Sequence, residues 1–558
     1  MKKLVKAGAF LAAIALVLVG CNCYNKMSSR MNEIKITSTP EVLALRGSTV
    51  TADMTVTFPA KYFNKKAVLK LTPVLVFDGG EIAGEPKFVQ GEKVKDNYTV
   101  IPFKAGGSYR QTVVLPFDER ASISTLELRI EYKCGCDDKE FELLGFKPVA
   151  DGVSTIQNSA DWASNLAIMP DNFKRVTTIT QEADLVYLVN SSQVRPVALN
   201  SAQIKLLEEF VKENSDKDRT ELGNLYSKGY ASPEGPVAFN DQLSKSRSES
   251  AKNAVGKKLK KTPVNIDAAA YGEDWEGFEK LVEQSNIQDR DLILQVLRMY
   301  SSPVQRDQEI RNMSQVFDVL KKEILPQLRR TQLVANADIT GKTDEEIKYA
   351  WNNNIGALNV EELLYSATLF SDNATKAKIY KAAADRFNDV RGFNNYGVVM
   401  VQEGKLADAT TAFNKAASMS SAPEISNNMG VIALIQGNVE DARRYLSPLN
   451  SDEAKANKGL LALAEGDFAT ASKSLTGYNL AVAQLSDGNV SQAKASLGNI
   501  DTADADYLRA VIAMREGNTE SAISNLNSAV KKDPSLAERA KRDIEFARIF
   551  GHRDFLAL

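Results

Sequence analysis

The chain has 558 residues, with 69 basic side chains against 71 acidic ones and a formal net charge of −2. This length exceeds what one hydrophobic core supports, so we expect several domains. The nearly balanced charge, without a basic stripe, predicts no nucleic-acid partner.

The N-terminus has the layout of a secretory signal. Residues 1–20 begin with two lysines, continue as an apolar run over 7–19 and end in Leu-Val-Gly directly before Cys21. The run is shorter than a membrane span and is typical of a signal peptide. Its last residues resemble the lipobox of bacterial lipoproteins, and this resemblance implies cleavage before Cys21 and lipidation of that cysteine.

A polar tether is predicted over residues 21–31. It lacks the Asp at the second position that retains lipoproteins in the inner membrane of enteric bacteria. It also lacks the acidic cluster of lipoproteins that are moved to the cell surface. The resemblance therefore implies a lipid-anchored protein of the outer membrane that faces the periplasm.

Residues 32–150 follow a period of two. Apolar residues alternate with polar ones over 50–58 and 126–134. Other candidate strands cover 68–77 and 109–117, and Gly-rich turns separate these stretches. Alternation places one face of a strand in a core and the other in water. Several short strands without an intervening helix predict a β-sandwich.

Two cysteines stand close together at the end of this region. In an extended strand, Cys134 and Cys136 point to the same face. In an oxidising compartment we predict a disulfide that braces a turn, with a thiol pair that takes part in exchange as the alternative. The chain has a single histidine, His552, and no second cysteine pair outside the tether, so no metal site is expected.

Residues 151–335 alternate between strand and helix patterns and predict an α/β domain. Strands are expected over 183–190, 226–230, 264–271 and 328–334, and helices over 199–213, 240–259, 289–300 and 313–324.

A strand, a Pro/Gly turn and an amphipathic helix meet in the middle of this domain. The turn is bounded by Gly229 and Gly235, and the helix carries Asn240, Ser244 and Arg247. The spacing i, i+4, i+7 places these three side chains on one helical face. A guanidinium, a hydroxyl and a carboxamide beside a tight turn predict a pocket for a ligand carboxylate.

The same stretch resembles the peptidoglycan-binding signature of the OmpA C-terminal-like family. The matching positions are Gly229, Gly235, Phe239, Asn240, Leu243, Ser244 and Arg247. The resemblance implies an OmpA-like α/β sandwich in which Arg247 holds a carboxylate of the diaminopimelate stem peptide. The family's acidic residue falls on Ser232 here, and Glu234 is the nearby acid. The predicted ligand-binding residues are therefore Arg247, Asn240, Ser232, Glu234 and Ser244.

A polar linker is predicted over 336–355, followed by helical repeats over 356–558. The repeats carry hinge glycines, each followed five residues later by an alanine, at Gly404, Gly437, Gly466, Gly488 and Gly517. They resemble shortened tetratricopeptide units, which stack into a solenoid with a concave face. This resemblance implies an unknown protein partner on that face.

The sequence thus predicts a multidomain protein with an N-terminal β-sandwich, a central OmpA-like α/β sandwich and a C-terminal all-α solenoid. The single histidine cannot supply a Ser/His/Asp or Cys/His set, so we predict no enzyme and no cofactor. The predicted function is an outer-membrane lipoprotein that anchors to peptidoglycan and binds a protein through its repeats. The alternative is an assembly scaffold for cell-envelope or surface complexes that has lost peptidoglycan binding.

Overall fold

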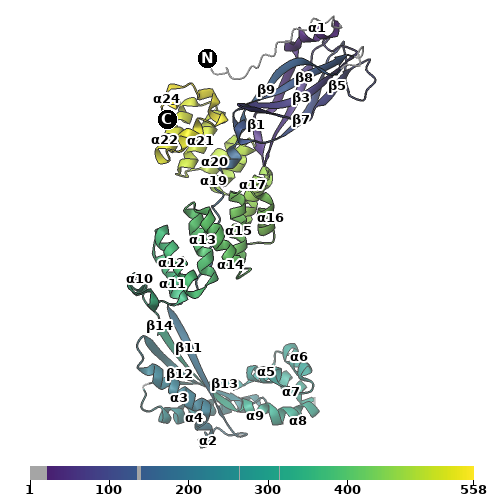
Figure 1. Cartoon of the computed structure of the whole chain (residues 1–558). Coiled ribbons are helices and arrows are strands. Elements are labelled where there is room, and N and C mark those ends of the chain that lie inside the picture. Colours follow the sequence, from purple (N-terminus) through teal and green to yellow (C-terminus); the bar gives the residue numbers. More distant parts are fainter. Residues whose placement is uncertain (1–21, 135–139, 263, 313) are drawn as a thin grey trace. The chain divides into compact units, whose positions relative to one another are not determined.

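The computed structural model describes residues 22–134, 140–262, 264–312 and 314–558. The predicted signal peptide, Cys21 and Cys136 lie outside these residues. The chain divides into two compact units (Figure 1). The first unit combines Met1–Pro170 with Phe370–Leu558, and the second is Asp171–Leu369.

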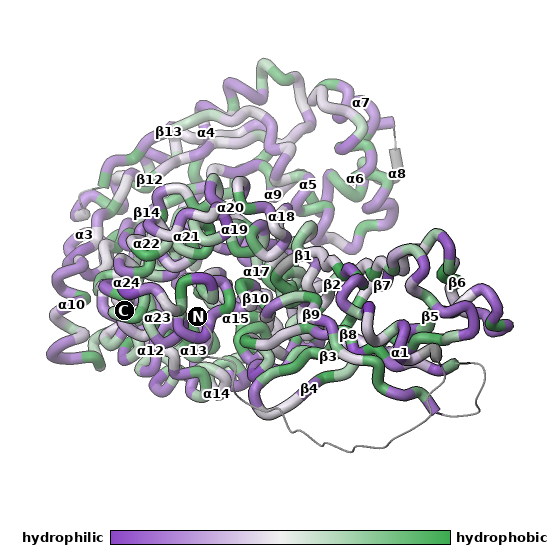
Figure 2. The backbone as a smooth tube through the Cα atoms, turned by 90° about the horizontal axis from the view of Figure 1, so that it is seen from above, coloured by the Kyte–Doolittle hydropathy of each residue, from purple (hydrophilic) through white to green (hydrophobic). Residues whose placement is uncertain are grey.

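The N-terminal part of the first unit consists of two β-sheets that share one core. Their strand orders are β10-β1-β2-β7 and β6-β5-β3-β8-β9, with β4 also paired to β3. The strands are β1 Lys35–Arg46, β2 Thr49–Phe58, β3 Ala67–Phe77, β4 Gly80–Ala83, β5 Lys87–Gly91, β6 Thr99–Ile101, β7 Gly107–Pro116, β8 Ser124–Cys134, β9 Glu142–Asp151 and β10 Val153–Ser154. Side chains of β2 alternate between buried and more exposed, whereas β3 is largely hydrophobic along its length (Figure 2). The predicted two-layered β architecture is observed.

The predicted tether is folded where the structure describes it. Helix α1, Asn22–Ser28, packs on the β-sheets through Met27, which is 1% exposed. The Tyr62 hydroxyl donates to the Met27 carbonyl at 3.1 Å, and the ring of Tyr24 lies 5.3 Å from that of Tyr132. The prediction of a polar tether is therefore wrong for Asn22–Ser28, because these residues form a helix that Met27 anchors in the apolar core.

The second unit is built on a four-stranded sheet with the order β11-β14-β12-β13. Its strands are β11 Val176–Val186, β12 Thr220–Ala231, β13 Ile266–Glu273 and β14 Arg330–Thr340. Only the β12–β13 pair is parallel. Helices α3 Ala202–Ser215 and α4 Val237–Lys258 contribute to its main core. A second core is formed by α5 Trp275–Gln284, α6 Arg290–Met299, α7 Pro303–Asn312, α8 Ser314–Glu323 and α9 Leu325–Leu328.

The predicted linker over 336–355 is wrong. Strand β14 continues to Thr340, and helix α10, Asp344–Asn353, follows directly. Thr343 and Glu346 form a reciprocal capping box at the start of α10. This Thr-x-x-Glu signature was present in the polar stretch whose composition suggested a loop. The short helices α2 Pro196–Leu199 and α11 Val360–Ser366 complete the second unit.

Helical hairpins form the C-terminal part of the first unit. The helices are α12 Asn373–Phe387, α13 Val390–Gln402, α14 Leu406–Ala417, α15 Pro423–Ile435, α16 Val439–Leu446, α17 Asp452–Ala464, α18 Phe468–Ser474, α19 Gly477–Ser486, α20 Val490–Leu497, α21 Ala503–Arg515, α22 Thr519–Lys532, α23 Leu536–Ala540 and α24 Arg553–Leu556. All five predicted hinge glycines have positive φ, between 71° and 82°. The five alanines that follow them are fully buried. The predicted repeats are confirmed as stacked helix pairs.

Candidate functional site

The predicted ligand turn lies where β12 ends and α4 begins in the second unit. Gly229 is required there, because a Cβ atom at this position would lie 2.0 Å from the Ser244 carbonyl oxygen. The close approach fixes the strand against the helix that carries Asn240, Ser244 and Arg247. The motif therefore has a packing role at this point of the fold.

Arg247 is buried, with 1% of its surface exposed. Its three nitrogens donate to main-chain carbonyls: Nε to Ser191 at 2.9 Å, Nη1 to Tyr230 at 2.9 Å and Nη2 to Leu188 at 3.3 Å. Its guanidinium lies 5.2 Å from the ring centre of Tyr187. Burial lowers the pKa of Arg247 to about 10, so the side chain remains charged at neutral pH.

Ser232 and Glu234 form a polar chain that ends at a second arginine. The Ser232 hydroxyl donates to Glu234 Oε1 at 2.7 Å, and Arg329 Nη2 pairs with the same carboxylate at 2.8 Å. Ser232 is 5% exposed. Both predicted turn residues are thus committed to each other and to Arg329.

Asn240 and Ser244 are also engaged within the protein. Asn240 donates to Glu273 Oε1 at 2.8 Å, and the second oxygen of that carboxylate accepts from Trp275 Nε1. The Ser244 hydroxyl donates to the Asp241 carbonyl and accepts from the Gly272 amide. The structure thus brings the predicted residues together, but their polar groups face protein partners. Arg247 does not face an open pocket, because the loop at 188–191 covers it.

A second polar cluster lies in the first unit, where sequence reasoning did not find it. Residues 156–170, here called the strap, leave the β-sheets and run along the helical repeats. Six buried asparagines contact the strap, and they are Asn394, Asn395, Asn427, Asn428, Asn457 and Asn479. They come from the first helices of four successive pairs, namely α13, α15, α17 and α19. We call this set the asparagine ladder.

Three ladder asparagines each hold both polar groups of one strap residue. Asn428 accepts from the Ala167 amide and donates to the Ala167 carbonyl, both at 2.7 Å. Asn395 holds Met169 in the same way, with both contacts at 2.8 Å. A carboxamide in this geometry replaces the neighbouring strand of a β-ladder, so recognition depends on the main chain of the strap.

Asn479 is the third of these clamps. It accepts from the Asp161 amide at 2.8 Å and donates to the Asp161 carbonyl at 3.1 Å. Between the clamps, the Asn165 carbonyl accepts from both Asn427 and Asn457, each at 2.9 Å.

The ladder carboxamides also bond to one another across the repeats. Asn457 donates to Asn427, Asn427 to Asn428, and Asn428 to Asn394. We call the face of the repeats that carries the ladder the groove. Connected amides of this kind orient each other, so this face is a pre-organised site. At one end of this series of hydrogen-bonded asparagines, the buried Oδ1 of Asn457 lacks a hydrogen-bond partner.

The sequence contained a signal for this ladder. In four repeats an asparagine stands nine residues before the hinge glycine: Asn395 before Gly404, Asn428 before Gly437, Asn457 before Gly466 and Asn479 before Gly488. A buried position that repeats as asparagine contrasts with the apolar packing expected on an inner helix. The fifth repeat has Leu508 at the equivalent position.

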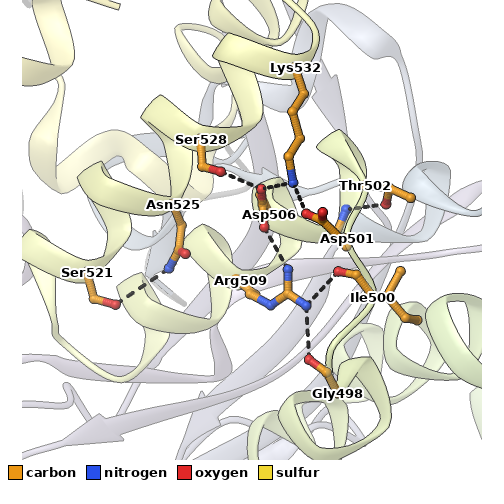
Figure 3. Close-up of polar contacts among 11 residues, drawn as sticks. Gly498, Ile500, Asp501, Thr502, Asp506, Arg509, Ser521, Asn525, Ser528 and Lys532 are labelled. Atoms are coloured by element: carbon orange, nitrogen blue, oxygen red, sulfur yellow. Dashed lines mark hydrogen bonds and ion pairs between the residues drawn. The ribbon is translucent and has the colours of Figure 1, made fainter.

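Ion pairs and hydrogen bonds of Asp506 hold the fifth repeat together. Asp506 accepts from Arg509 Nη1 at 2.6 Å, Ser528 Oγ at 2.6 Å and Lys532 Nζ at 2.7 Å (Figure 3). Arg509 also donates to the carbonyls of Gly498 and Ile500. These contacts join the two helices of the last pair to the preceding turn, so this cluster is structural.

The described part of the chain offers no site for cysteine-based chemistry or for a metal ion. Cys134 is disulfide-bonded, which argues against the thiol-exchange alternative for this residue; its predicted partner Cys136 is not described. Within the described residues, no group of three or more His, Cys, Asp or Glu side chains could hold a metal ion.

Comparisons with known proteins give limited similarity. No protein-family model matches the chain, and no curated protein matches it. Among solved structures, a tetratricopeptide repeat protein from Parabacteroides merdae ATCC 43184 matches 36% of this chain and 91% of its own, with 15% identity and a TM-score of 0.30. A chain from the structure of the APC/C hetero-tetramer Cut9–Hcn1 matches 37% of this chain and 45% of its own length, with 13% identity and a TM-score of 0.31.

Proposed function

We propose that this protein is a non-enzymatic scaffold whose helical repeats bind polypeptide. The asparagine ladder carries the proposal: its carboxamides form a row of donors and acceptors aimed at main-chain groups. Such a row suits a peptide segment better than a small substrate, since it recognises the amide and carbonyl that every residue presents.

The single histidine supports a non-catalytic role. His552 serves as the N-cap of α24, where its Nδ1 accepts from the Asp554 amide at 3.3 Å. A histidine committed to a helix end is not positioned as a general base for a nucleophile.

The scaffold role is tested by fixing the strap in the groove with a covalent cross-link. The double variant Ala167→Cys/Asn428→Cys is treated with a bismaleimide, which ties the strap to α15, or with a monomaleimide, which does not. Both forms are then cross-linked to proteins of the cell envelope and analysed by mass spectrometry. We expect cross-links on α13–α19 in the unlocked form and their loss in the locked form. Equal cross-linking in both would overturn the role of the groove, and no cross-linked protein in either would overturn the scaffold.

We further propose that the chain is lipid-anchored through Cys21 at the periplasmic side of the outer membrane. The signal-like residues 1–20 and the lipobox-like end support this proposal. Among the helices that the structure describes, none has the length and hydropathy needed to cross a membrane. Labelling with a palmitate analogue tests the anchor: the wild type should take up label and Cys21→Ser should not.

Peptidoglycan binding through the second unit is a second candidate. It is supported by the motif at the β12–α4 junction, where Glu234 and Arg329 form a partly accessible ion pair with side chains 18% and 12% exposed. The test is co-sedimentation of the full chain with diaminopimelate-type peptidoglycan. Glu234→Gln should reduce pelleting, and Glu276→Gln on the exposed side of α5 should not. A wild type that stays in the supernatant would exclude this candidate and leave the scaffold proposal intact.

A further inference from the structure

Helix α1 begins at Asn22, the residue that follows the proposed lipid anchor. Consecutive Cα atoms are about 3.8 Å apart, so the covalent chain keeps Asn22 next to Cys21. An α-helix rises about 1.5 Å per residue, which places Met27 about 8 Å from Asn22 along α1. A lipid carried by Cys21 is therefore joined to α1 without a spacer.

Helix α1 is fixed to one end of the two β-sheets (Figure 1). Met27 is 1% exposed and belongs to the core of the sheets, and its carbonyl accepts from the Tyr62 hydroxyl at 3.1 Å. Directly after the helix, Arg30 Nη1 donates to the Lys61 carbonyl at 2.8 Å. The anchor and this end of the sheets are thus connected through a docked helix and not through a free tether.

Three segments form the surface around the helix, and we call this surface the anchor end. They are α1, residues 59–66 and residues 101–106. The Lys61 amide donates to the Phe103 carbonyl at 2.6 Å, which joins the last two segments. Exposed side chains of the anchor end include Tyr24, Lys26, Lys61, Lys66 and Lys104.

Acidic side chains close to the anchor end are engaged by neighbouring side chains. The contacts are Glu33 with Arg30 at 2.6 Å, Glu92 with Lys65 at 3.5 Å and Glu142 with the Tyr132 hydroxyl at 2.6 Å. The exposed lysines therefore give the anchor end a positive surface.

We propose that the anchor end is a membrane-docking surface that binds anionic lipid headgroups. This proposal rests on the lipid anchor at Cys21, because the anchor brings the surface to the bilayer. A lysine near an anionic membrane strengthens binding by about fivefold. Tyr24, with 38% of its surface exposed, suits the interface because its ring is apolar and its hydroxyl is polar.

The experiment separates this surface from the lipid. The mature chain, without residues 1–20 and with Cys21→Ser, carries no acyl group and keeps every described residue of both units. It is mixed with vesicles of phosphatidylcholine, alone or with phosphatidylglycerol, and bound protein is measured by flotation at low salt. We expect binding to the vesicles that contain phosphatidylglycerol and little binding to the neutral ones.

A triple variant tests the lysines. Lys26→Gln/Lys66→Gln/Lys104→Gln should lower the partition coefficient for the anionic vesicles by at least about tenfold. The matched control is Lys212→Gln/Lys217→Gln/Lys260→Gln, which removes the same charge from exposed positions of the second unit and should leave binding unchanged. Circular dichroism establishes that both variants are folded.

The docking surface is overturned if the acyl-free chain does not bind the anionic vesicles, or if both triple variants lose binding equally. Should the first variant fail to fold, binding of the chain with native lysines decides, since raised salt must weaken it by screening. Binding that does not change with salt overturns the proposal. A failed lipid anchor is recognised separately, because it abolishes palmitate labelling and leaves binding of the acyl-free chain unaffected.

Discussion

Arg247 occupies the arginine position of a ligand-binding motif, but in the structure its side chain holds two segments of the fold together. It is the largest fully buried side chain among the described residues. Its hydrogen bonds join the loop at 188–191 to the end of β12, so it fastens two segments of the second unit. A guanidinium is suited to this task because it presents several donors in a rigid plane.

Replacing Arg247 should therefore unfold the second unit more easily. Arg247→Ala leaves three carbonyls without this donor and opens a cavity, and we expect a loss of about 3 kcal/mol or more. Urea unfolding followed by circular dichroism measures it. Arg298→Ala is the matched control, since its side chain is 69% exposed and should change stability by less than about 1 kcal/mol. An unchanged free energy of unfolding in Arg247→Ala would contradict the structural role of this side chain.

Asp543 is a second buried charge, at the C-terminal cap of the repeats. It is 8% exposed, accepts from the Tyr507 hydroxyl at 2.8 Å and lies near Glu545. Burial is the main cause that raises the pKa of Asp543 above its usual range, followed by repulsion from Glu545, while Arg539 acts in the opposite direction. Ionised Asp543 is therefore less favourable in the folded chain than in the unfolded one.

The sign of the pH dependence follows from this shift. Protonated Asp543 contributes stability below its unfolded pKa of about 3.9, and this contribution is lost as pH rises through the higher folded pKa. Asp543→Asn should thus stabilise the first unit at pH 7, by about 1.4 kcal/mol for each unit of the shift. The difference from wild type should disappear near pH 4. Thermal unfolding of both proteins between pH 4 and 8 measures this difference in stability. A difference between Asp543→Asn and the wild type that does not change with pH would contradict the prediction.

At the scale of elements, the repeat helices combine apolar packing with the polar ladder. Hinge glycines end each first helix in the left-handed region, which side-chain-bearing residues rarely adopt. The ladder asparagines on these first helices lie in an interior where unpaired carboxamides would be costly. Their bonds to the strap offset that cost, so the groove and its occupant stabilise each other.

Asn428→Ala should release the strap locally. The Ala167 amide loses its acceptor, and we expect its hydrogen exchange to accelerate by at least about tenfold, the equivalent of 1.4 kcal/mol of opening free energy. Exchange measured by mass spectrometry on peptides covering 161–170 reports it. The matched control Asn414→Ala, on an exposed face of α14, should leave these peptides unchanged. Unchanged exchange in Asn428→Ala would contradict the clamp.

At the scale of the whole molecule, the two units have separate cores and should unfold as two cooperative transitions. Differential scanning calorimetry should resolve them. Arg247→Ala should move one transition and Asn428→Ala the other, because the two residues belong to different units. A single transition shifted by both variants would show that the units unfold together.

Local patterns in the sequence predicted much of the architecture. Alternating residues in β2 and the spaced glycines of the repeats each reflect contacts made within a few residues or with the next repeat. The capping box at Thr343 is equally local, but the polar composition of the stretch around it favours a loop. The ladder spacing before the hinge glycines was also visible, but only the structure showed what it binds.

The sequence by itself determined most of the strands of the N-terminal sheets and the helix pairs of the repeats, since periodicity and backbone preference act over short distances. Only the tertiary structure decided the burial of Arg247 and the occupant of the groove. Ala167 and Asn428 are 261 residues apart, and their contact depends on folding two stretches around an inserted unit. The ladder asparagines leave a periodic trace in the repeats. The strap leaves none, because it is recognised through main-chain groups that every sequence shares.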